Sequence, residues 1–472
     1  MLFFPPVAFK PDVRDHLRNT FTNEELVSEV GEEVAEREFE ALLSSLSHPP
    51  SFTCVRVNTH LAPRRHIQHT LQEELTGQQP CGRHGEDVSL VPLPHPQLPD
   101  VLLLPIIGPR RVCVLASEVL VGAQCGSAVL RGAHVFAPGM LSAPKTLQVG
   151  DVVSVFSDVE SRCTRGAKSF EGQKVFLGNG VCEMSRSDVF CSGGPLRGVA
   201  VRMTDRLYTT PCFDRVLPHL VFLQNLPSVL VSHVLGPRPG ECVLDMCAAP
   251  GGKTTHIATL MGNKGVVVAL DKTRSKVEKL RENAANQQLD CIQAYCYNSI
   301  QAAASNQAHK TQESSGGVDG PPFPEETFDR VLLDAPCSGL GQRPNMAVGA
   351  SLKEVCSYPP LQRKLLTTAV RLLKRGGVLV YSTCTVTLAE NEEQVAWALR
   401  TFPSLKLQHQ EPHLGEQGML GSGLSHDQRL LLQRFHPRMK EGMASDGHAS
   451  MPRLDEANSD TIGFFIAKLI KS

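Results

Sequence analysis

The 472-residue sequence lacks three patterns that would each assign it to a special class of protein. Its 15 cysteines include no C-x-x-C pair, so neither a zinc-ribbon pattern nor a disulfide framework is expected. Its apolar runs are too short to cross a bilayer. The first residues, MLFFPPVAFK, have no basic residue ahead of their proline-interrupted apolar patch, so no secretory leader is expected. These absences favour reduced thiols in a cytosolic or nuclear setting, and a cytoplasmic protein is expected.

The sequence also lacks net charge, because 47 Lys and Arg residues stand against 48 Asp and Glu residues. A globally basic nucleic-acid binder is therefore not expected. The charge is nevertheless uneven: residues 110–206 hold twelve Lys and Arg against eight Asp and Glu, a net charge of +4. This mild bias is compatible with contacts to phosphate groups.

A chain of this length is expected to form more than one domain. A capping box at Thr22–Glu25 and apolar residues at helical spacing predict one helix that ends before Pro49. Residues 92–100 (PLPHPQLPD) are typical of a proline-rich connector. Short β-type runs between glycines from residue 112 predict a compact β-barrel, and residues 216–235 predict a helical stretch.

From Gly240 onward, apolar segments of strand length alternate with helical segments. The strand segments are CVLDM, VVVALD, IQAYCYN, DRVLLD, GGVLVYST and, last, TIGFFIAKLI. The alternation predicts a doubly wound, parallel α/β sheet. Residues 301–326 are polar, aperiodic and rich in Gly and Pro, which predicts a loop.

Five residues capable of chemistry fall at or near the ends of these predicted strands: Asp245, Asp271, Asn298, Asp334 and Cys384. The C-terminal ends of parallel strands share one edge of a sheet, and in open α/β sheets ligands bind at that edge. We therefore expect these side chains to line a single site.

A glycine turn follows the strand that ends at Asp245 and opens a helix, in VLDMCAAPGGKT. Such a turn lets backbone approach a ligand closely, and Asp271 stands where a carboxylate can bind ribose hydroxyls. The turn is not G-x-G-x-x-G, which disfavours NAD. S-adenosylmethionine needs the ribose carboxylate and the glycine turn without a pyrophosphate cradle. Taken alone, the segment is equally consistent with an ordinary strand–helix loop.

Two cysteines belong to the same predicted edge: Cys337 in VLLDAPCSGLG and Cys384 after GGVLVYST. A thiolate that adds to C6 of cytosine makes C5 able to attack an electrophilic methyl group. An acid at the N3 edge of the ring, such as Asp334, stabilises charge during that addition. The pattern does not decide which cysteine attacks, and either one alone is as consistent with an inert buried thiol.

At these residues the chain closely resembles the NOL/NOP/Sun RNA cytosine-5 methyltransferases. The resemblance covers about 230 residues and rests on CAAPGGKT (247–254), LDAPCSGLG (333–341), YSTCT (381–385), AENE (389–392) and GFFIAK (463–468). It implies a Rossmann-like class I methyltransferase domain without a metal. It implies roles for Cys384 as nucleophile, Cys337 in product release, Asp334 against the cytosine and Lys253 near the ring or the cofactor tail. Residues implied to bind S-adenosylmethionine are Cys247, Ala248, Ala249, Pro250, Gly251, Gly252, Lys253, Asp271, Asn298 and Asp334.

One position departs from the family pattern, which carries Asp where this chain has Asn298. An Asn carbonyl accepts the hydrogen bond of the cofactor's adenine amine without the assistance of a negative charge. We expect weaker cofactor binding rather than loss of activity. A catalytically silent RNA-binding protein is the alternative hypothesis, with Asn298 as its only support. A DNA or protein methyltransferase is disfavoured, because residues 112–203 resemble an RNA-binding domain.

The segments VLRGAHVFAPG (129–139) and VGDVVSVFSD (149–158) resemble a PUA domain, a small barrel that holds structured RNA. Within the family, a PUA insertion indicates a tRNA-modifying member, so we expect it to act on a cytosine near the tRNA acceptor end. Nothing in the sequence suggests an obligate interface, so a monomer is expected. The expected division is an α+β RNA-recognition module in two parts (1–111 and 204–235), the PUA domain (112–203) and the methyltransferase domain (236–472). Candidate phosphate contacts are Arg131, Arg165, Lys168 and Lys174, although solvated surface charge is as good an interpretation for each.

Overall fold

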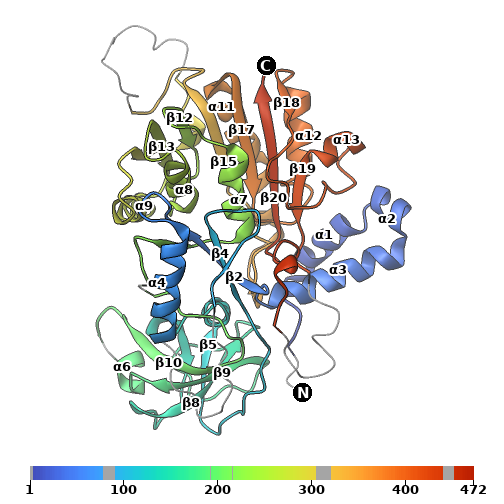
Figure 1. Ribbon diagram of the computed structural model, residues 1–472. Coiled ribbons are helices and arrows are strands. Elements are labelled where there is room, and N and C mark those ends of the chain that lie inside the picture. Colours follow the sequence, from blue (N-terminus) through green and yellow to red (C-terminus); the bar gives the residue numbers. More distant parts are fainter. Residues whose placement is uncertain (1–3, 78–90, 192, 215, 305–319, 439–450) are drawn as a thin grey trace.

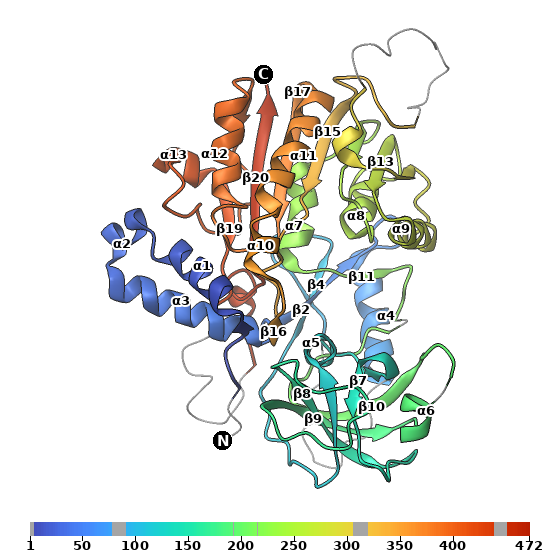
Figure 2. The same ribbon diagram turned by 180° about the vertical axis from the view of Figure 1, so that it is seen from behind.

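The computed structural model describes residues 4–77, 91–191, 193–214, 216–304, 320–438 and 451–472. Three sheets organise these residues, and a fourth pairing joins two short strands, β1 (Ala8–Phe9) and β16 (Ala347–Val348). The largest sheet, with its helices, forms one end of the molecule and the six-stranded sheet forms the other (Figures 1 and 2). Within the described part of the chain, no helix combines the length and the apolar character needed to cross a membrane.

The largest sheet has eight strands in the order β14-β13-β12-β15-β17-β20-β18, with β19 paired to β20. Its first five strands are parallel. They are β12 (Cys242–Asp245), β13 (Val266–Asp271), β14 (Ile292–Cys296), β15 (Phe328–Asp334) and β17 (Leu373–Thr383). The helices between and beside them are α8 (Gly252–Leu260), α9 (Arg274–Asn286), η2 (Ser299–Gln301), α10 (Leu352–Val355) and α11 (Tyr358–Leu372). The alternation predicted from the sequence is confirmed here.

The other edge of this sheet is antiparallel, so the expectation of a wholly parallel sheet was wrong. Strand β20 (Phe464–Lys471) runs antiparallel to β17, and both β18 (Leu405–Leu407) and β19 (Leu432–Phe435) run antiparallel to β20. The helices and turns of this part are α12 (Glu392–Thr401), α13 (His426–Leu430) and η3 (Leu454–Glu456). A buried strand has the same apolar pattern in either direction, so its sequence does not reveal its orientation.

A six-stranded sheet in the order β6-β10-β9-β8-β5-β7 occupies residues 118–206 and has a hydrophobic core of its own. Its strands are β5 (Glu118–Gly122), β6 (Val135–Phe136), β7 (Met140–Ser142), β8 (Val152–Asp158), β9 (Lys174–Cys182) and β10 (Val199–Arg206). Two helices and a 3-10 turn accompany it, namely α5 (Ala123–Leu130), α6 (Arg186–Phe190) and η1 (Ala137–Gly139). The region is therefore a compact β-rich unit, as its short β-type runs predict.

A four-stranded sheet takes strands from both sides of this unit. Its order is β11 (Val221–Leu223), β2 (Phe52–Val57), β4 (Val101–Pro105) and β3 (Leu93–Pro94), and α4 (Arg64–Gly77) follows β2 along the chain. Two expectations were wrong here. The supposed connector at 92–100 contains β3 and leads directly into β4, and the stretch 216–235 divides into β11 and the helix α7 (Leu226–Leu235). Pro227 in the first turn of α7 favours a helix start there.

The N-terminal segment forms three helices, α1 (Pro11–Phe21), α2 (Glu24–Val30) and α3 (Glu32–Ser47). The expected single helix was wrong because Gly31 adopts φ +85°, which is outside the helical range and ends α2. These helices share a hydrophobic cluster with Leu340, Val355, Val386 and Leu388 of the large-sheet region. Helix α7 likewise packs with the large sheet. The N-terminal helices and α7 therefore both pack against the large-sheet region.

Candidate active site

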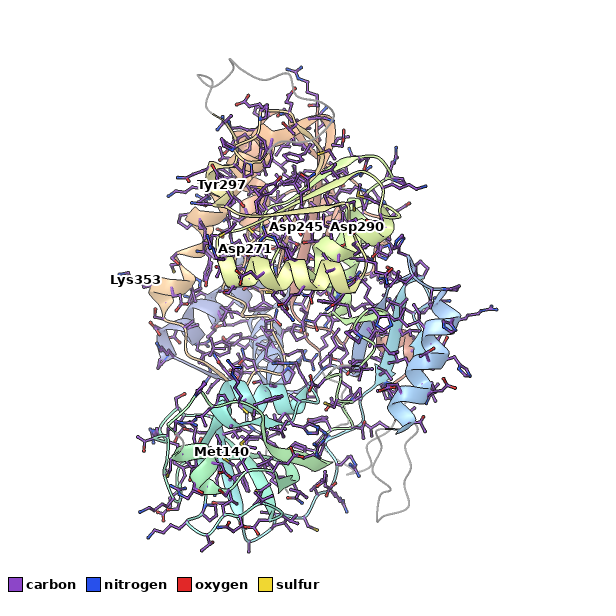
Figure 3. The ribbon with its side chains drawn as sticks, turned by 90° about the vertical axis from the view of Figure 1, so that its left-hand side faces the viewer. Met140, Asp245, Asp271, Asp290, Tyr297 and Lys353 are labelled. Carbon is purple, nitrogen blue, oxygen red and sulfur yellow. The ribbon has the colours of Figure 1, made fainter. Side chains whose placement is uncertain are left out.

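The five residues expected at one sheet edge lie there. Asp245, Asp271 and Asp334 are the last residues of β12, β13 and β15, and Cys384 directly follows β17. Asn298 stands two residues beyond β14. Because these strands are parallel neighbours in the sheet, the side chains share its C-terminal edge. Figure 3 labels Asp245 and Asp271 in this region, and Met140 marks the six-stranded unit below it.

The glycine turn lies between β12 and α8. Gly251 adopts φ +105°, a conformation that side chains rarely allow, and a Cβ there would come within 3.1 Å of Leu280. Gly252 is the first residue of α8. A Cβ at Gly252 would lie 3.1 Å from the ring of Phe222, on β11 of the four-stranded sheet. The two glycines thus allow a sharp turn and a close approach of the neighbouring sheet.

Asp245 is buried beneath this turn. Its Oδ2 accepts a 2.7 Å hydrogen bond from the Thr254 hydroxyl, whereas its Oδ1 has no partner among the described residues. Burial raises the pKa of Asp245 to about 7. A buried acceptor without a partner next to a glycine turn suits a ligand that carries N–H groups, such as the methionine moiety of S-adenosylmethionine.

Asp271 and Asn298 lie at the ends of neighbouring strands. The Asp271 Oδ1 accepts a 2.9 Å hydrogen bond from the backbone N–H of Thr273, and the side chain is half-buried. Asn298 is exposed, and its Oδ1 accepts a 3.2 Å hydrogen bond from the Ile300 N–H at the start of η2. The Asn298 carbonyl oxygen therefore caps a turn, and its second lone pair is available for another donor.

Asp334 holds an ion pair with Lys253, with 2.8 Å between Nζ and Oδ2. Its other oxygen accepts a 2.7 Å hydrogen bond from the Ser382 hydroxyl. The Lys253 side chain is 12% exposed, and its ammonium lies 5.5 Å from the centroid of the Phe464 ring. These contacts orient a carboxylate and an ammonium at the point where the glycine turn, β15 and β17 meet.

The sulfur atoms of Cys337 and Cys384 lie 3.4 Å apart, and both residues are half-buried. The hydrogen bond from the Cys337 thiol lowers the pKa of Cys384, against the opposite effects of burial and of the Asp334 charge. The same contact, together with burial and the Glu390 charge, raises the pKa of Cys337 well above its usual value. The pair therefore favours a Cys384 thiolate, the reactive form, with Cys337 protonated beside it.

A cavity of about 640 Å³ opens at this edge. Asp245, Lys253 and Asp334 line its large-sheet side. The other two sheets and the segments next to them line the remaining walls, with Phe52, Cys54, Phe222, Gln224, Ala128, Arg131, His134 and Phe136 among the lining residues. Cys337 and Cys384 are not among the described residues that line the cavity. Asp334 belongs to its wall and acts electrostatically on Cys384, so it connects the cavity with the thiols.

The four predicted phosphate contacts differ in their surroundings. Arg131 lines the cavity, and its guanidinium donates to the Pro344 carbonyl at 3.4 Å. Arg165 donates to four backbone carbonyls of the six-stranded unit, and Lys174 pairs with Glu118. Lys168 is exposed and has no hydrogen bond or ion pair with any described residue. Lys168 is thus the one of the four with an unengaged charge, and the RNA-binding roles stay predictions.

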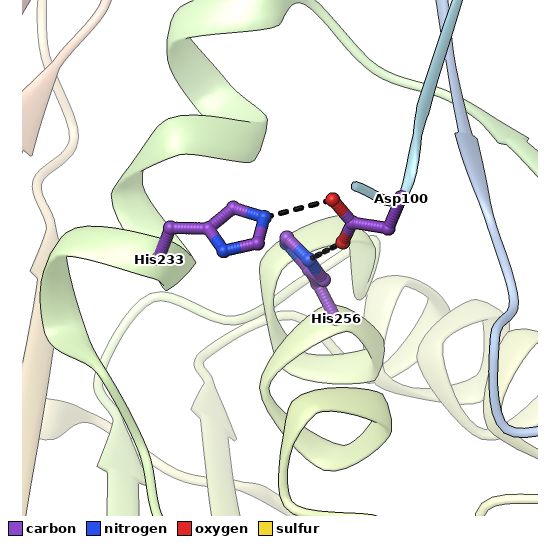
Figure 4. Close-up of side chains that lie close together, drawn as sticks. All are labelled: Asp100, His233 and His256. Carbon is purple, nitrogen blue, oxygen red and sulfur yellow. Dashed lines mark hydrogen bonds and ion pairs between the residues drawn. The ribbon is translucent and has the colours of Figure 1, made fainter. Parts of the chain in front are cut away.

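No sequence pattern predicted the cluster formed by Asp100, His233 and His256, of which Asp100 and His256 are buried and His233 is half-buried (Figure 4). Asp100 precedes β4, and its two oxygens bond Nε2 of His233 on α7 at 2.8 Å and Nε2 of His256 on α8 at 2.6 Å. Burial acts to raise the pKa of Asp100, but the two imidazoles outweigh burial and lower it.

The cluster offers metal-type donors but not the geometry of a metal site. The Nδ1 of His256 has no partner among the described residues, whereas a histidine ligand normally donates its second N–H to an acceptor. Both Nε2 atoms are instead hydrogen-bonded to Asp100. The cluster therefore links the four-stranded sheet to α7 and to α8, the helix that begins at the glycine turn.

Known proteins match the large-sheet region and, for several relatives, the whole chain. The family model described as 16S rRNA methyltransferase RsmB/F matches residues 232–470. Over its whole length the chain is 55% identical to the mouse protein tRNA (cytosine(72)-C(5))-methyltransferase NSUN6, of which the alignment covers 98%. The human protein of the same name is 54% identical, with 100% of this chain and 99% of that protein covered.

An archaeal relative and a solved structure extend the comparison. A tRNA (cytosine(72)-C(5))-methyltransferase of Pyrococcus horikoshii is 29% identical over 98% of this chain and 97% of its own. The crystal structure of NSun6 from Pyrococcus horikoshii with SFG aligns with a TM-score of 0.73 at 27% identity and covers 98% of both chains. The likeness therefore extends over all three sheets, beyond the large one alone.

Proposed function

The chain belongs to the RsmB/F, or Sun-type, family of S-adenosylmethionine-dependent RNA methyltransferases, and we propose that it methylates C5 of a cytosine in tRNA. We propose further that the cytosine is position 72, at the acceptor end, since the full-length relatives carry that specificity in their names. The observation that carries the proposal is the thiol pair beside the Asp334–Lys253 ion pair.

The proposed chemistry begins at Cys384. Its thiolate adds to C6 of the cytosine, which makes C5 nucleophilic. S-adenosylmethionine, when bound at the glycine turn with Asp245, Asp271 and Asn298, supplies the electrophilic methyl group. Asp334 lies at the N3 edge of the ring and donates a proton toward N3 during addition, and Lys253, which donates to Asp334, supplies that proton. After methylation a base takes the C5 proton, the electron pair of that C–H bond restores the C5–C6 double bond, and Cys384 leaves C6 as a thiolate. Cys337 assists this release.

The six-stranded unit is proposed to be a PUA domain (112–203) that holds the RNA, inserted into a recognition module (1–111 and 204–235) ahead of the methyltransferase domain (236–472). The mixed origin of the four-stranded sheet supports the insertion, because its strands come from both sides of the six-stranded unit. The cavity supports a shared substrate site, because residues of all three sheets line it. A target at the end of a helix lowers the cost of unstacking the base. A cytoplasmic, monomeric enzyme without a metal completes the proposal.

The experiment that tests the function is transfer of labelled methyl from S-adenosylmethionine to total tRNA, followed by nucleoside analysis. Label in 5-methylcytidine is expected with the wild type and with Cys356→Ala, a control at an exposed thiol. No label is expected with Cys384→Ala. A wild type that binds tRNA tightly but transfers no methyl at saturating cofactor would instead support the silent RNA-binding protein, with Asn298 as the first residue to restore to Asp.

A further inference from the structure

The AENE segment, residues 389–392, is a sequence motif to which the proposed chemistry assigns no role. Its last three side chains, Glu390, Asn391 and Glu392, are each at most 1% exposed. Charged side chains are almost never buried this completely without partners. The partners of Glu390 and Asn391 lie next to the two cysteines.

Glu390 binds residues from both cysteine loops. Its carboxylate accepts hydrogen bonds from the Ser338 N–H at 2.9 Å and the Ser338 hydroxyl at 2.6 Å. It also accepts from the hydroxyls of Thr387 at 3.0 Å and Thr385 at 3.5 Å. Ser338 directly follows Cys337, and Thr385 directly follows Cys384, so one carboxylate connects the two loops. Ser338 and Thr385 also contact each other, with 2.8 Å between their hydroxyl oxygens.

The residues that precede each cysteine are held by the neighbours of Glu390. Gln362 donates both to Glu390 at 3.1 Å and to the carbonyl of Pro336 at 3.0 Å. Asn391 accepts from the Thr383 hydroxyl and donates to the Thr385 carbonyl at 3.1 Å. Cys337 therefore lies between two anchored residues, Pro336 and Ser338, and Cys384 lies between Thr383 and Thr385.

The Glu390 network is the set of Glu390, Asn391, Gln362, Ser338 and Thr385. The two N–H donors, from Ser338 and Gln362, both contact Oε2 of Glu390, and the hydroxyls of Ser338, Thr385 and Thr387 contact Oε1. Burial raises the pKa of Glu390, and these hydrogen bonds oppose the rise. The charge also helps to raise the pKa of Cys337, which keeps that thiol protonated and able to donate to Cys384.

We propose that Glu390 is a positioning residue for the reaction: it anchors the two cysteine loops so that the thiols of Cys337 and Cys384 stay in contact. The inference rests on the proposed function and deepens it. Glu390 contacts the neighbours of the cysteines rather than the reacting atoms, so its effect passes through the thiol pair. A Gln at this position removes the negative charge and replaces Oε1, the acceptor of the Ser338 and Thr387 hydroxyls, with an N–H donor. This weakens the link between the loops without changing the size of the side chain.

The test is peptide-resolved alkylation of the free enzyme with iodoacetamide across pH, because thiolate content governs the rate. In the wild type, Cys384 is expected to react about tenfold or more faster than Cys337 at neutral pH, since one pKa unit is a tenfold change in thiolate. In Glu390→Gln the ratio is expected to fall below about threefold. The same variant is expected to lose about 10- to 100-fold in kcat, with KM for tRNA and for S-adenosylmethionine nearly unchanged.

Two matched variants separate positioning from folding. Glu392→Gln makes the same change at another fully buried carboxylate, which pairs with Arg434, and is expected to lower the melting temperature without altering the alkylation ratio. Glu393→Gln, at the half-buried next residue, is the control for an unaffected enzyme. A folded Glu390→Gln enzyme with the wild-type ratio and the wild-type kcat would overturn the proposal.

Ser338→Ala covers the case in which Glu390→Gln does not fold. It removes the 2.6 Å hydroxyl donor and keeps the backbone donor, so a smaller change of the alkylation ratio in the same direction is expected, and no change overturns the proposal. Alkylation needs neither RNA nor cofactor. A ratio that depends on Glu390 in an enzyme that transfers no methyl would therefore refute the proposed function while supporting the positioning role.

Discussion

The sulfur atoms of Cys337 and Cys384 lie 3.4 Å apart although 47 positions separate the residues in the chain. The strands β15 and β17 bring them together, since they are parallel neighbours in which Asp334 pairs with Ser382. Each cysteine follows its strand by one to three residues. The contact therefore depends on the register of two strands, and it gives the two thiols opposite pKa shifts.

A covalent complex with tRNA is expected to accumulate in Cys337→Ala. This variant keeps the Cys384 nucleophile and lacks the group that assists release, so the C6–S bond persists after methylation. The complex is detected as a band that survives denaturing electrophoresis and requires S-adenosylmethionine. Cys384→Ala and the double variant are expected to give no such band. A band of equal strength in Cys384→Ala would reverse the assigned roles.

Asn298→Asp is expected to tighten cofactor binding. A charged acceptor strengthens a hydrogen bond by about 1 kcal/mol over a neutral one, which corresponds to a roughly fivefold lower Kd for S-adenosylmethionine. Isothermal titration calorimetry on the enzyme without RNA measures the change. Asn298→Ala, which also removes the cap on the Ile300 N–H, is the comparison and is expected to bind more weakly than the wild type. Equal affinities for S-adenosylmethionine in all three proteins would mean that the Asn298 side chain does not bind the adenine.

Asp245→Asn is expected to stabilise the cofactor-free protein at high pH. Burial raises the pKa of Asp245 to about 7 from an ordinary value of 3.8, so between these values the folded state retains a proton that the unfolded state loses. The contribution of Asp245 to stability is therefore greatest at low pH and falls by about 1.4 kcal/mol per pH unit as the pH rises through this window.

The measurement for this prediction is urea unfolding of both proteins at pH 5 and pH 8. The free energy of unfolding of Asp245→Asn, relative to that of the wild type, is expected to be about 2–3 kcal/mol higher at pH 8 than at pH 5. Asp290→Asn, at an exposed residue between α9 and β14, is the control and is expected to show no such increase. An advantage independent of pH would mean that Asp245 is ionised throughout.

Lys168→Ala is expected to weaken tRNA binding. Loss of one phosphate contact reduces the slope of log K against log salt by about 0.7–0.9 and affects all tRNA sequences alike. Filter binding at several salt concentrations measures the slope. Lys264→Ala, an exposed lysine between α8 and β13, is the control and is expected to leave it unchanged. An unchanged slope in Lys168→Ala would mean that Lys168 is a solvated surface residue that does not contact a phosphate of the tRNA.

The sequence by itself determined which residues end the parallel strands, because strand-length apolar segments and the glycine turn are local patterns. Asp245, Asp271, Asp334 and Cys384 were predicted at one edge on this ground, and they lie there. The motifs also indicated the family before any geometry was known. The local pattern was misleading at Gly31. Apolar residues continue at helical spacing on both sides of this glycine, but the glycine divides the expected single helix.

Only the tertiary structure decided what these residues contact. The direction of β20, the 3.4 Å thiol contact and the bonds of Glu390 to both cysteine loops all join segments that are distant in the chain. The Asp100 cluster arises in the same way, from a supposed connector and two helices. A hydrogen bond between side chains tens of residues apart depends on sheet register and helix packing, and neither is encoded by the spacing of the residues that form it.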